Sequence, residues 1–146
     1  YDAYCSNEVM TEAGVIPVNS PEELYQTCDI ISLHIPATPE TKASINYSLV
    51  SKMPKGGVLV NTARKEVIDE EGLITLMQER TDLKYMTDVM PAADAKFRTL
   101  FEGRYFATPK KMGAQTAEAN INAGIAAAKQ IVDYIQNGNT RFQVNK

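Results

Sequence analysis

The run from Val58 to Ala63 constrains the fold of this 146-residue chain more than any other stretch. Val58-Leu59-Val60 is followed by Asn61-Thr62-Ala63, without the alternation of a strand that has one face in water. A strand this continuously apolar needs cover on both faces, which is typical of a parallel sheet flanked by helices. The run therefore predicts an α/β fold.

Strand-like and helix-like segments alternate along the rest of the chain. Further strands are predicted at Gly14–Val18, Asp29–Ile35, Leu83–Val89 and Tyr105–Thr108. Helices are predicted from Ser20 to Cys28, from Asn46 to Met53, from Asp69 to about Arg80, and from Thr116 to about Gln136. Ser20, Asp69 and Thr116 are residue types that cap helices, and Gly138 is a stop signal. Strands separated by helices indicate a largely parallel sheet within one domain.

Composition favours a small-molecule partner. A net charge of -3 offers no electrostatic footprint for nucleic acid or for an anionic membrane. The two cysteines, Cys5 and Cys28, lack metal-ligand spacing and favour a reduced, cytoplasmic compartment, and we expect no metal site. No apolar run is long enough to span a bilayer and no signal peptide is present. The start at Tyr1 rather than Met suggests a piece of something larger.

Polar residues follow the strands where parallel sheets bind their ligands, at the carboxyl ends. They are Asp2 after a truncated strand, His34-Ile35-Pro36, Asn61-Thr62-Ala63-Arg64, Asp88, and Lys110-Lys111. Each alone could be a cap or a turn former, but five groups on one edge indicate a binding site.

Arg64 and Asp2 suggest the chemistry of this edge. A guanidinium at the end of a buried strand is suited to holding a carboxylate and polarising an adjacent carbonyl, although it could also be a surface arginine. A carboxylate after the second strand of a dinucleotide fold accepts hydrogen bonds from ribose hydroxyls. The glycine fingerprint that should precede Asp2 by about twenty residues is absent and would lie before Tyr1.

In order along the chain, these motifs resemble those of the D-2-hydroxyacid dehydrogenases. The matching stretches are Tyr1-Asp2-Ala3-Tyr4, Leu33 to Thr41, Val60 to Arg64, Thr87-Asp88-Val89, Thr108-Pro109, and Gly113 to Ala119. The resemblance implies a Rossmann-type parallel sheet with helices on both faces, missing its first strands, and NAD as cofactor. It assigns cofactor contacts to Asp2, His34, Ile35, Pro36, Thr62, Ala63, Arg64, Asp88, Gly113 and Ala114, and makes Arg64 a catalytic residue as well.

Two departures from the family pattern fall on the groups that handle the proton. The family's catalytic histidine is replaced by Lys111, and the glutamate that orients it by Ala93, with Asp94 adjacent and a candidate for its role. A lysine ammonium is cationic at neutral pH, since the reference pKa of lysine is about 10.4, and needs no carboxylate to protonate it. Lys111 is therefore the expected proton donor and acceptor, with Lys110 as the fallback. The alternative is that both lysines are solvated and the site is inactive.

The resemblance further implies NAD-dependent oxidation of a phosphorylated hydroxyacid, D-3-phosphoglycerate, to 3-phosphohydroxypyruvate in serine biosynthesis. Alternatives are a hydroxypyruvate or glyoxylate reductase, or a catalytically silent, NAD-sensing interaction protein. Residues 1–146 would be the C-terminal portion of the NAD-binding domain, with about 137–146 a tail packing toward an absent substrate domain. An N-terminal segment would complete the fold, and the cofactor domains would pair in a homodimer.

Overall fold

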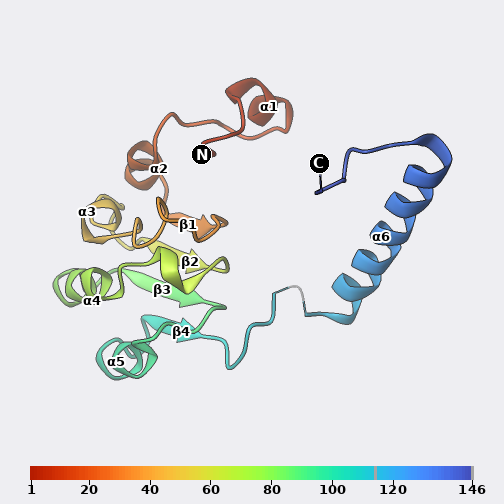
Figure 1. The fold of residues 1–146 in the computed structure, drawn as a ribbon. Helices are drawn as coiled ribbons and strands as arrows, with labels where there is room; N and C mark the ends of the chain where they lie inside the picture. The colour runs from red at the N-terminus through yellow and green to blue at the C-terminus, as the bar shows by residue number, and fades with distance from the viewer. Residues whose placement is uncertain (114, 146) are drawn as a thin grey trace. The chain divides into compact units, whose positions relative to one another are not determined.

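A computed structural model describes residues 1–113 and 115–145, which form two compact units, Tyr1–Lys111 and Met112–Lys146. The first unit contains one parallel sheet (Figure 1). Its strands are β1 (Ile30–Leu33), β2 (Val58–Asn61), β3 (Lys84–Thr87) and β4 (Tyr105–Ala107), and they neighbour one another in chain order. The α/β fold with a parallel sheet is confirmed.

Helices alternate with the strands. They are α2 (Pro21–Thr27), α3 (Tyr47–Val50), α4 (Glu70–Glu79) and α5 (Asp94–Leu100), with a short 3-10 turn, η1 (Lys65–Val67), between β2 and α4. Three of them, α2, α3 and α4, begin where the sequence indicated. The Ser20 side chain accepts a hydrogen bond from the Glu23 amide, and the Asp69 side chain accepts one from the Gly72 amide. These contacts satisfy amides that the first turn of a helix leaves without an intrahelical partner.

The core lies on one face of this sheet. Ile31, Leu59 and Tyr85 point into a cluster that also holds residues of all four helices, such as Tyr25 and Phe97. Parallel strands joined in chain order by right-handed crossovers place their helices on the same face. The opposite face, for which we also expected cover, carries side chains such as Ile30 and Phe106, which are 67% and 55% exposed. Val58 and Val60 on that face are half-buried.

The structure corrects the expectation at Gly14–Val18, which forms no strand. Val15 and Ile16 are 55% and 91% exposed, and no strand of the described residues lies beside them. A segment of β-forming residues cannot become a strand without a neighbour to pair with its backbone. Two helices were not expected: α5, and α1 (Asn7–Glu12), which is capped by Ser6.

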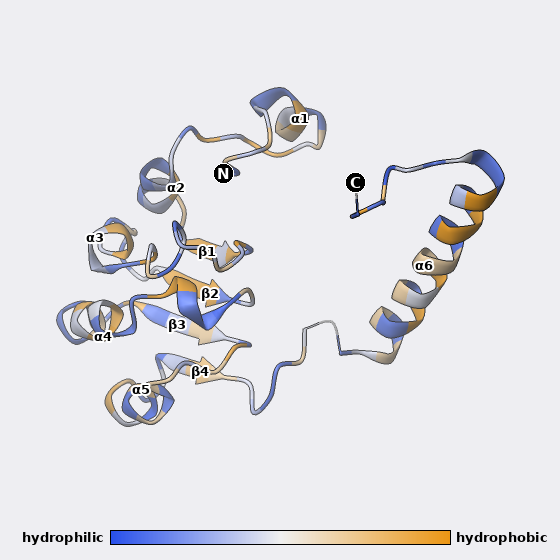
Figure 2. Cartoon of the chain, in the orientation of Figure 1, coloured by the Kyte–Doolittle hydropathy of each residue, from blue (hydrophilic) through white to orange (hydrophobic). Residues whose placement is uncertain are grey.

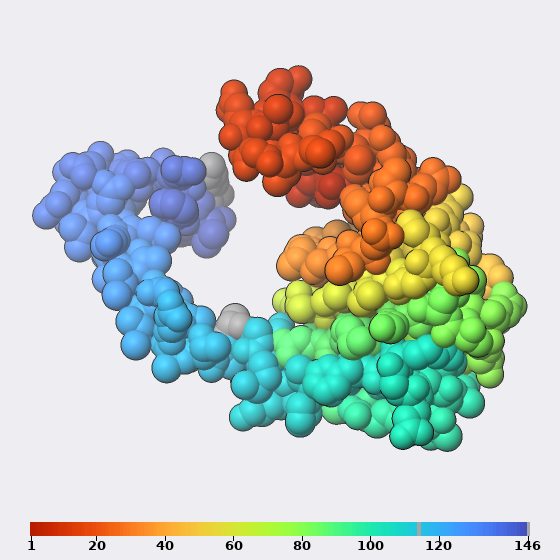
Figure 3. Space-filling view, turned by 180° about the vertical axis from the view of Figure 1, so that it is seen from behind, coloured from red at the N-terminus to blue at the C-terminus, as the bar shows by residue number. Residues whose placement is uncertain are grey.

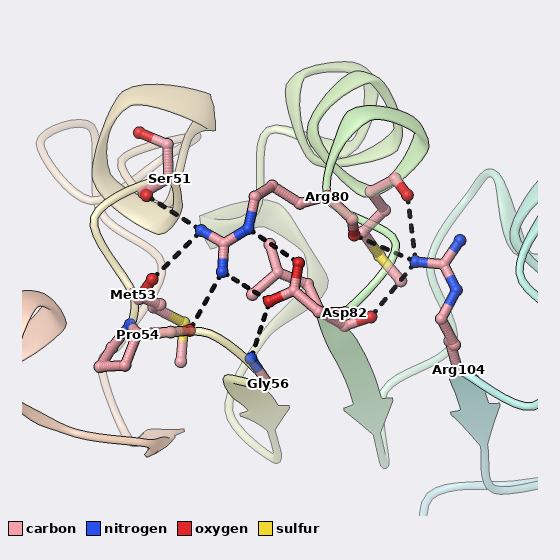
Figure 4. Close-up of polar contacts among 9 residues, drawn as sticks. Ser51, Met53, Pro54, Gly56, Arg80, Asp82 and Arg104 are labelled. Carbon is pink, nitrogen blue, oxygen red and sulfur yellow. Dashed lines mark hydrogen bonds and ion pairs between the residues drawn. The ribbon is translucent and has the colours of Figure 1, made fainter.

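Two arginines bind backbone carbonyls at the amino ends of the strands (Figure 4). Arg80 donates to the carbonyls of Met53 and Pro54 at 3.2 and 3.1 Å, just before β2. Arg104 donates to the carbonyls of Met77 and Leu83 at 3.0 and 3.3 Å. This end of the sheet is therefore held by side chains, and the opposite end is left for the candidate site.

The second unit consists of α6 (Ala117–Asn137) and the residues that follow it. The Thr116 side chain accepts a hydrogen bond from the Ala119 amide at 3.0 Å, and Gly138 ends the helix with a φ of 64°. Apolar residues run along α6 (Figure 2), and they include the exposed Ile121, Ile125, Val132 and Ile135. In the described part of the chain, no helix has the length and apolarity to cross a membrane.

Candidate active site

The carboxyl ends of the four strands lie in one row. Pairing register aligns Leu33 with Asn61, Asn61 with Thr87, and Thr87 with Ala107. The next residue of each strand is therefore at the same edge of the sheet: His34, Thr62, Asp88 and Thr108. This register meets the sequence-based expectation for the motifs that follow β1, β2, β3 and β4, whereas Asp2 follows no strand in the described part of the chain.

Asp2 and the His34-Ile35-Pro36 segment line one cavity of about 670 Å³. Figure 3 shows the N-terminal residues, in red, beside the orange residues that follow them in the chain. Asp2 Oδ1 accepts hydrogen bonds from the amides of Tyr4 and Cys5 at 2.7 and 3.1 Å, which fixes the carboxylate and leaves Oδ2 available. The His34 ring lies 2.9 Å from the Ser32 hydroxyl, measured from Nε2 to Oγ. The cavity combines apolar walls with a carboxylate, which suits an adenosine group.

Arg64 follows β2 at the end of a short loop and is exposed. Its Nη1 donates to the Ala63 carbonyl at 2.8 Å, so the remaining donors of the guanidinium can reach a ligand. Thr62 is exposed and Ala63 is half-buried in the same loop. The arrangement presents a fixed positive charge and a planar set of donors at the sheet edge.

Asp88 is the most buried carboxylate of this edge, with 8% of its surface exposed. Its Oδ1 accepts a hydrogen bond from the Thr108 hydroxyl at 2.8 Å, and its amide donates to the Asn61 carbonyl at 2.9 Å. These contacts tie the ends of β2, β3 and β4 together. The carboxylate is therefore held at a defined position beside the loop that carries Arg64.

The two lysines follow Thr108 and are both exposed. Lys110 and Lys111 both follow β4, on the edge of the sheet that carries Asp88. Gly113 belongs to the second unit and is exposed. The cofactor contact expected of Ala114 lies outside the described residues.

Asp94 stands at the first residue of α5, and both of its carboxylate oxygens are engaged. Arg98 Nε donates to Oδ2 at 2.8 Å and the Tyr105 hydroxyl donates to Oδ1 at 2.7 Å. The Arg98 guanidinium holds the pKa of Asp94 below its usual range. These contacts favour an anchoring role for Asp94 between α5 and β4 over the orientation of a proton-handling group.

Sequence reasoning gave no role of their own to three polar residues that shape this edge: Asn61, Thr108 and Glu70. Glu70 accepts hydrogen bonds from the amides of Ala92 and Ala93 at 2.9 and 2.7 Å, and so holds the segment where the family pattern has its glutamate. A polar residue inside an apolar run was the available signal for Asn61. In the described part of the chain, no group of three or more histidine, cysteine or acidic residues could hold a metal ion.

Comparison with known proteins adds an independent observation. The family model described as "D-isomer specific 2-hydroxyacid dehydrogenase, NAD binding domain" matches residues 1–109. D-3-phosphoglycerate dehydrogenases of Haemophilus influenzae and Methanocaldococcus jannaschii are 34% and 36% identical over 134 residues. These alignments cover 88% and 90% of this chain, but only 32% and 25% of the relatives.

A solved structure is similar over the whole chain. The crystal structure of NAD+-bound 3-phosphoglycerate dehydrogenase from Entamoeba histolytica matches with a TM-score of 0.82 and 53% identity. The match covers 100% of this chain and 46% of the other. The chain thus spans less than half the length of that protein and about a third or less of the two curated relatives.

Proposed function

This chain belongs to the D-2-hydroxyacid dehydrogenases, within their NAD-binding domain, and on that basis we propose that it is part of an enzyme that oxidises D-3-phosphoglycerate to 3-phosphohydroxypyruvate with NAD. The observation that carries the proposal is the 53% identity, along the entire chain, to a 3-phosphoglycerate dehydrogenase that was crystallised with NAD+. The Haemophilus and Methanocaldococcus relatives are named for the same substrate.

The residues at the sheet edge fit NAD at both of its ends. Asp2 would accept hydrogen bonds from the adenine-side ribose, and His34, Ile35 and Pro36 form the wall of the same cavity. Asp88, fixed by Thr108, would accept a hydrogen bond from the nicotinamide carboxamide. Thr62 and Ala63 are the further cofactor contacts in this proposal. The pyrophosphate between the two ends needs the glycine-rich turn that this chain does not contain.

The reaction itself needs an anchor for the substrate and an acceptor for a proton. Arg64 binds the substrate carboxylate and polarises the oxygen on the neighbouring carbon. The amine of Lys111 accepts the hydroxyl proton while the hydride leaves the same carbon, and the carbon–oxygen bond becomes double. NAD+, when bound, would supply the acceptor for that hydride. Lys110 is the alternative proton acceptor.

The same proposal covers the parts of the enzyme that lie outside these 146 residues. A segment preceding Tyr1 pairs with the open edge of β1 and supplies the phosphate-binding turn. A substrate domain recognises the phosphate group, and residues 137–146 pack toward that domain. The full enzyme is a cytoplasmic homodimer joined through its cofactor domains.

The test is NADH formation by the full-length protein with NAD+ and 3-phosphoglycerate, glycerate or lactate offered separately. We expect turnover with the phosphorylated substrate, and its absence with every hydroxyacid overturns the proposal. A preference for the unphosphorylated acids assigns the enzyme to another activity of the family.

Two lysine variants make this test specific to the mechanism. Lys111→Ala should lower kcat by about a hundredfold or more, the usual contribution of a general acid or base. Lys110→Ala is the matched control and should keep most of the activity. The reverse outcome moves the proton-handling role to Lys110, and retained activity in both variants contradicts lysine catalysis.

A further inference from the structure

The loop that carries Arg64 is closed by the side chain of one residue, Asn61. Asn61 Oδ1 accepts a hydrogen bond from the Ala63 amide at 3.0 Å. Its Nδ2 donates to the carbonyl of Arg64 at 2.9 Å. Both polar ends of a single amide are therefore bonded to backbone two and three residues further along. The path of the chain from β2 to Arg64 depends on this pair of contacts.

Burial shows that this amide is not there for packing. Asn61 has 0% of its surface exposed, and its neighbours on the core face of the sheet include Leu33, Leu59 and Tyr85. A hydrophobic side chain of similar size would fit such a position without the cost of desolvating an amide. The buried amide is tolerated because the 63–64 backbone satisfies it. The contribution of Asn61 at this position therefore comes from its hydrogen bonds to the loop backbone.

The backbone of Asn61 connects the same loop to the neighbouring strand. Its carbonyl accepts hydrogen bonds from the Asp88 amide at 2.9 Å and from the Thr87 hydroxyl at 3.1 Å. Asp88 is in turn bonded through its carboxylate to Thr108, two residues before Lys110. One residue thus sets the position of the Arg64 backbone relative to Asp88.

We propose that Asn61 is a positioning residue, which fixes Arg64 relative to the nicotinamide-side carboxylate so that the substrate carboxylate is held at the correct place for hydride transfer. This inference rests on the proposed function, because the role of Arg64 as substrate anchor belongs to it. Asn61 does not touch the substrate. It acts through the backbone of Arg64.

The test is Asn61→Asp in the full-length protein. The aspartate keeps an acceptor for the Ala63 amide but replaces the donor to the Arg64 carbonyl with a second acceptor, so the loop must open. We expect kcat/KM for 3-phosphoglycerate to fall about tenfold to a hundredfold, mainly through KM. The affinity for NADH, measured by fluorescence, should fall by a smaller factor than kcat/KM, because Asp2 and the His34 segment are untouched.

Two further variants separate positioning from loss of stability. Asp69→Ala removes the cap of α4 on the same face of the sheet, and should lower the melting temperature without raising KM. In an Arg64→Ala background, Asn61→Asp should have almost no further effect on kcat/KM, because the guanidinium that Asn61 positions is absent. Equal losses in both backgrounds overturn the proposal, as does an equal rise of KM in Asp69→Ala.

Failure of the proposed function can be recognised separately. If the wild-type protein oxidises none of the three hydroxyacids, the activity assignment fails whatever Asn61 does. Crystal structures of the wild type and Asn61→Asp then decide the positioning role. A displaced Arg64 carbonyl in the variant supports the role, and an unchanged loop overturns it.

Discussion

Arg80 and Asp82 form a two-point ion pair, with Nε to Oδ1 at 2.9 Å and Nη2 to Oδ2 at 2.6 Å. The same guanidinium donates to the carbonyls of Met53 and Pro54, and Asp82 Oδ2 accepts from the Gly56 amide at 2.7 Å. Figure 4 shows this network between the end of α4 and the turn before β2. The pair therefore joins two crossover connections that are far apart in the sequence.

Replacing this arginine by lysine should destabilise the protein. Arg80→Lys keeps the charge but loses the planar set of donors that serves the carboxylate and the carbonyls at once. We expect the free energy of unfolding to fall by about 2 kcal/mol, as for charged groups with several hydrogen bonds. Urea unfolding of the full-length protein measures it. Lys96→Ala, which breaks the exposed Lys96–Glu71 pair, is the control and should cost less than about 1 kcal/mol.

The Arg80–Asp82 pair should also make the stability of the folded protein depend on pH in the acidic range. The hydrogen bond from Arg80, with that from the Gly56 amide, holds the pKa of Asp82 far below its usual range. A carboxyl whose pKa is lowered by folding stabilises the native state above its unfolded pKa of about 3.9, and this contribution is lost as pH falls toward the folded value. The melting temperatures of wild type and Asp82→Asn should therefore differ most above about pH 5 and converge below about pH 4. A constant difference down to strongly acidic pH contradicts the assignment.

Tyr85→Phe should leave the protein equally stable or more stable. Tyr85 is 1% exposed, and its hydroxyl is buried without a hydrogen-bond partner in the described part of the chain. The ring packs on Phe97 and Tyr105, with centroids 5.5 and 5.7 Å apart, and phenylalanine keeps those contacts. Removing an unsatisfied buried hydroxyl should raise the free energy of unfolding by up to about 1 kcal/mol.

The matched variant for this prediction is Tyr105→Phe. Its hydroxyl donates to Asp94 at 2.7 Å, so its removal should cost about 1 kcal/mol. Denaturant unfolding compares the two proteins directly. A loss of stability in Tyr85→Phe as large as that in Tyr105→Phe would show that the Tyr85 hydroxyl is satisfied.

Gly72→Ala should destabilise α4 although alanine is the better helix former. A methyl group at this position would collide with the carboxylate of Asp69, which caps the helix, and would lie 3.3 Å from the Tyr47 amide nitrogen. Displacing the cap should cost about 1 kcal/mol. In an Asp69→Ala background the collision with the carboxylate is absent, and thermal melting should show a smaller penalty or a gain for Gly72→Ala.

A lysine as proton acceptor predicts that oxidation of the hydroxyacid is fastest at alkaline pH. An ammonium group must lose its proton before it can take one from the substrate hydroxyl, so the rate rises with pH. The reverse reaction, reduction of the ketoacid, needs the ammonium form and should be favoured at lower pH. The pH profile of kcat in both directions measures this, and an acidic or flat optimum for oxidation counts against lysine.

The sequence predicted the elements whose causes are local. Ser20, Asp69 and Thr116 cap the expected helices, because a capping side chain needs only the next few amides of its own chain. Gly14–Val18 was predicted wrongly since a strand depends on a neighbour that the local pattern cannot reveal. The short helices α1 and α5 lack a long periodic pattern, and the sequence analysis missed them.

The candidate site likewise contains features that the sequence predicts and features that depend on tertiary contacts. The strand-end motifs were predictable because parallel register puts the carboxyl ends on one edge. The role of Asn61 could not be predicted, because in the sequence it is a single polar residue within an apolar run. Its role depends on the hydrogen bonds that its side chain forms with the backbone of Ala63 and Arg64. Asp94 was predicted from its neighbour in a motif, whereas its actual contacts, Arg98 and Tyr105, depend on how α5 packs.

The open side of β1 bears on how this chain behaves when produced by itself. Among the residues that the structure describes, this strand pairs with β2 alone, and its outward-facing Ile30 is 67% exposed. Such a border recruits further strands from other molecules, which is the usual route to insoluble aggregates. Expression of residues 1–146 alone should therefore yield inclusion bodies, and co-expression with the N-terminal segment proposed above should restore soluble material.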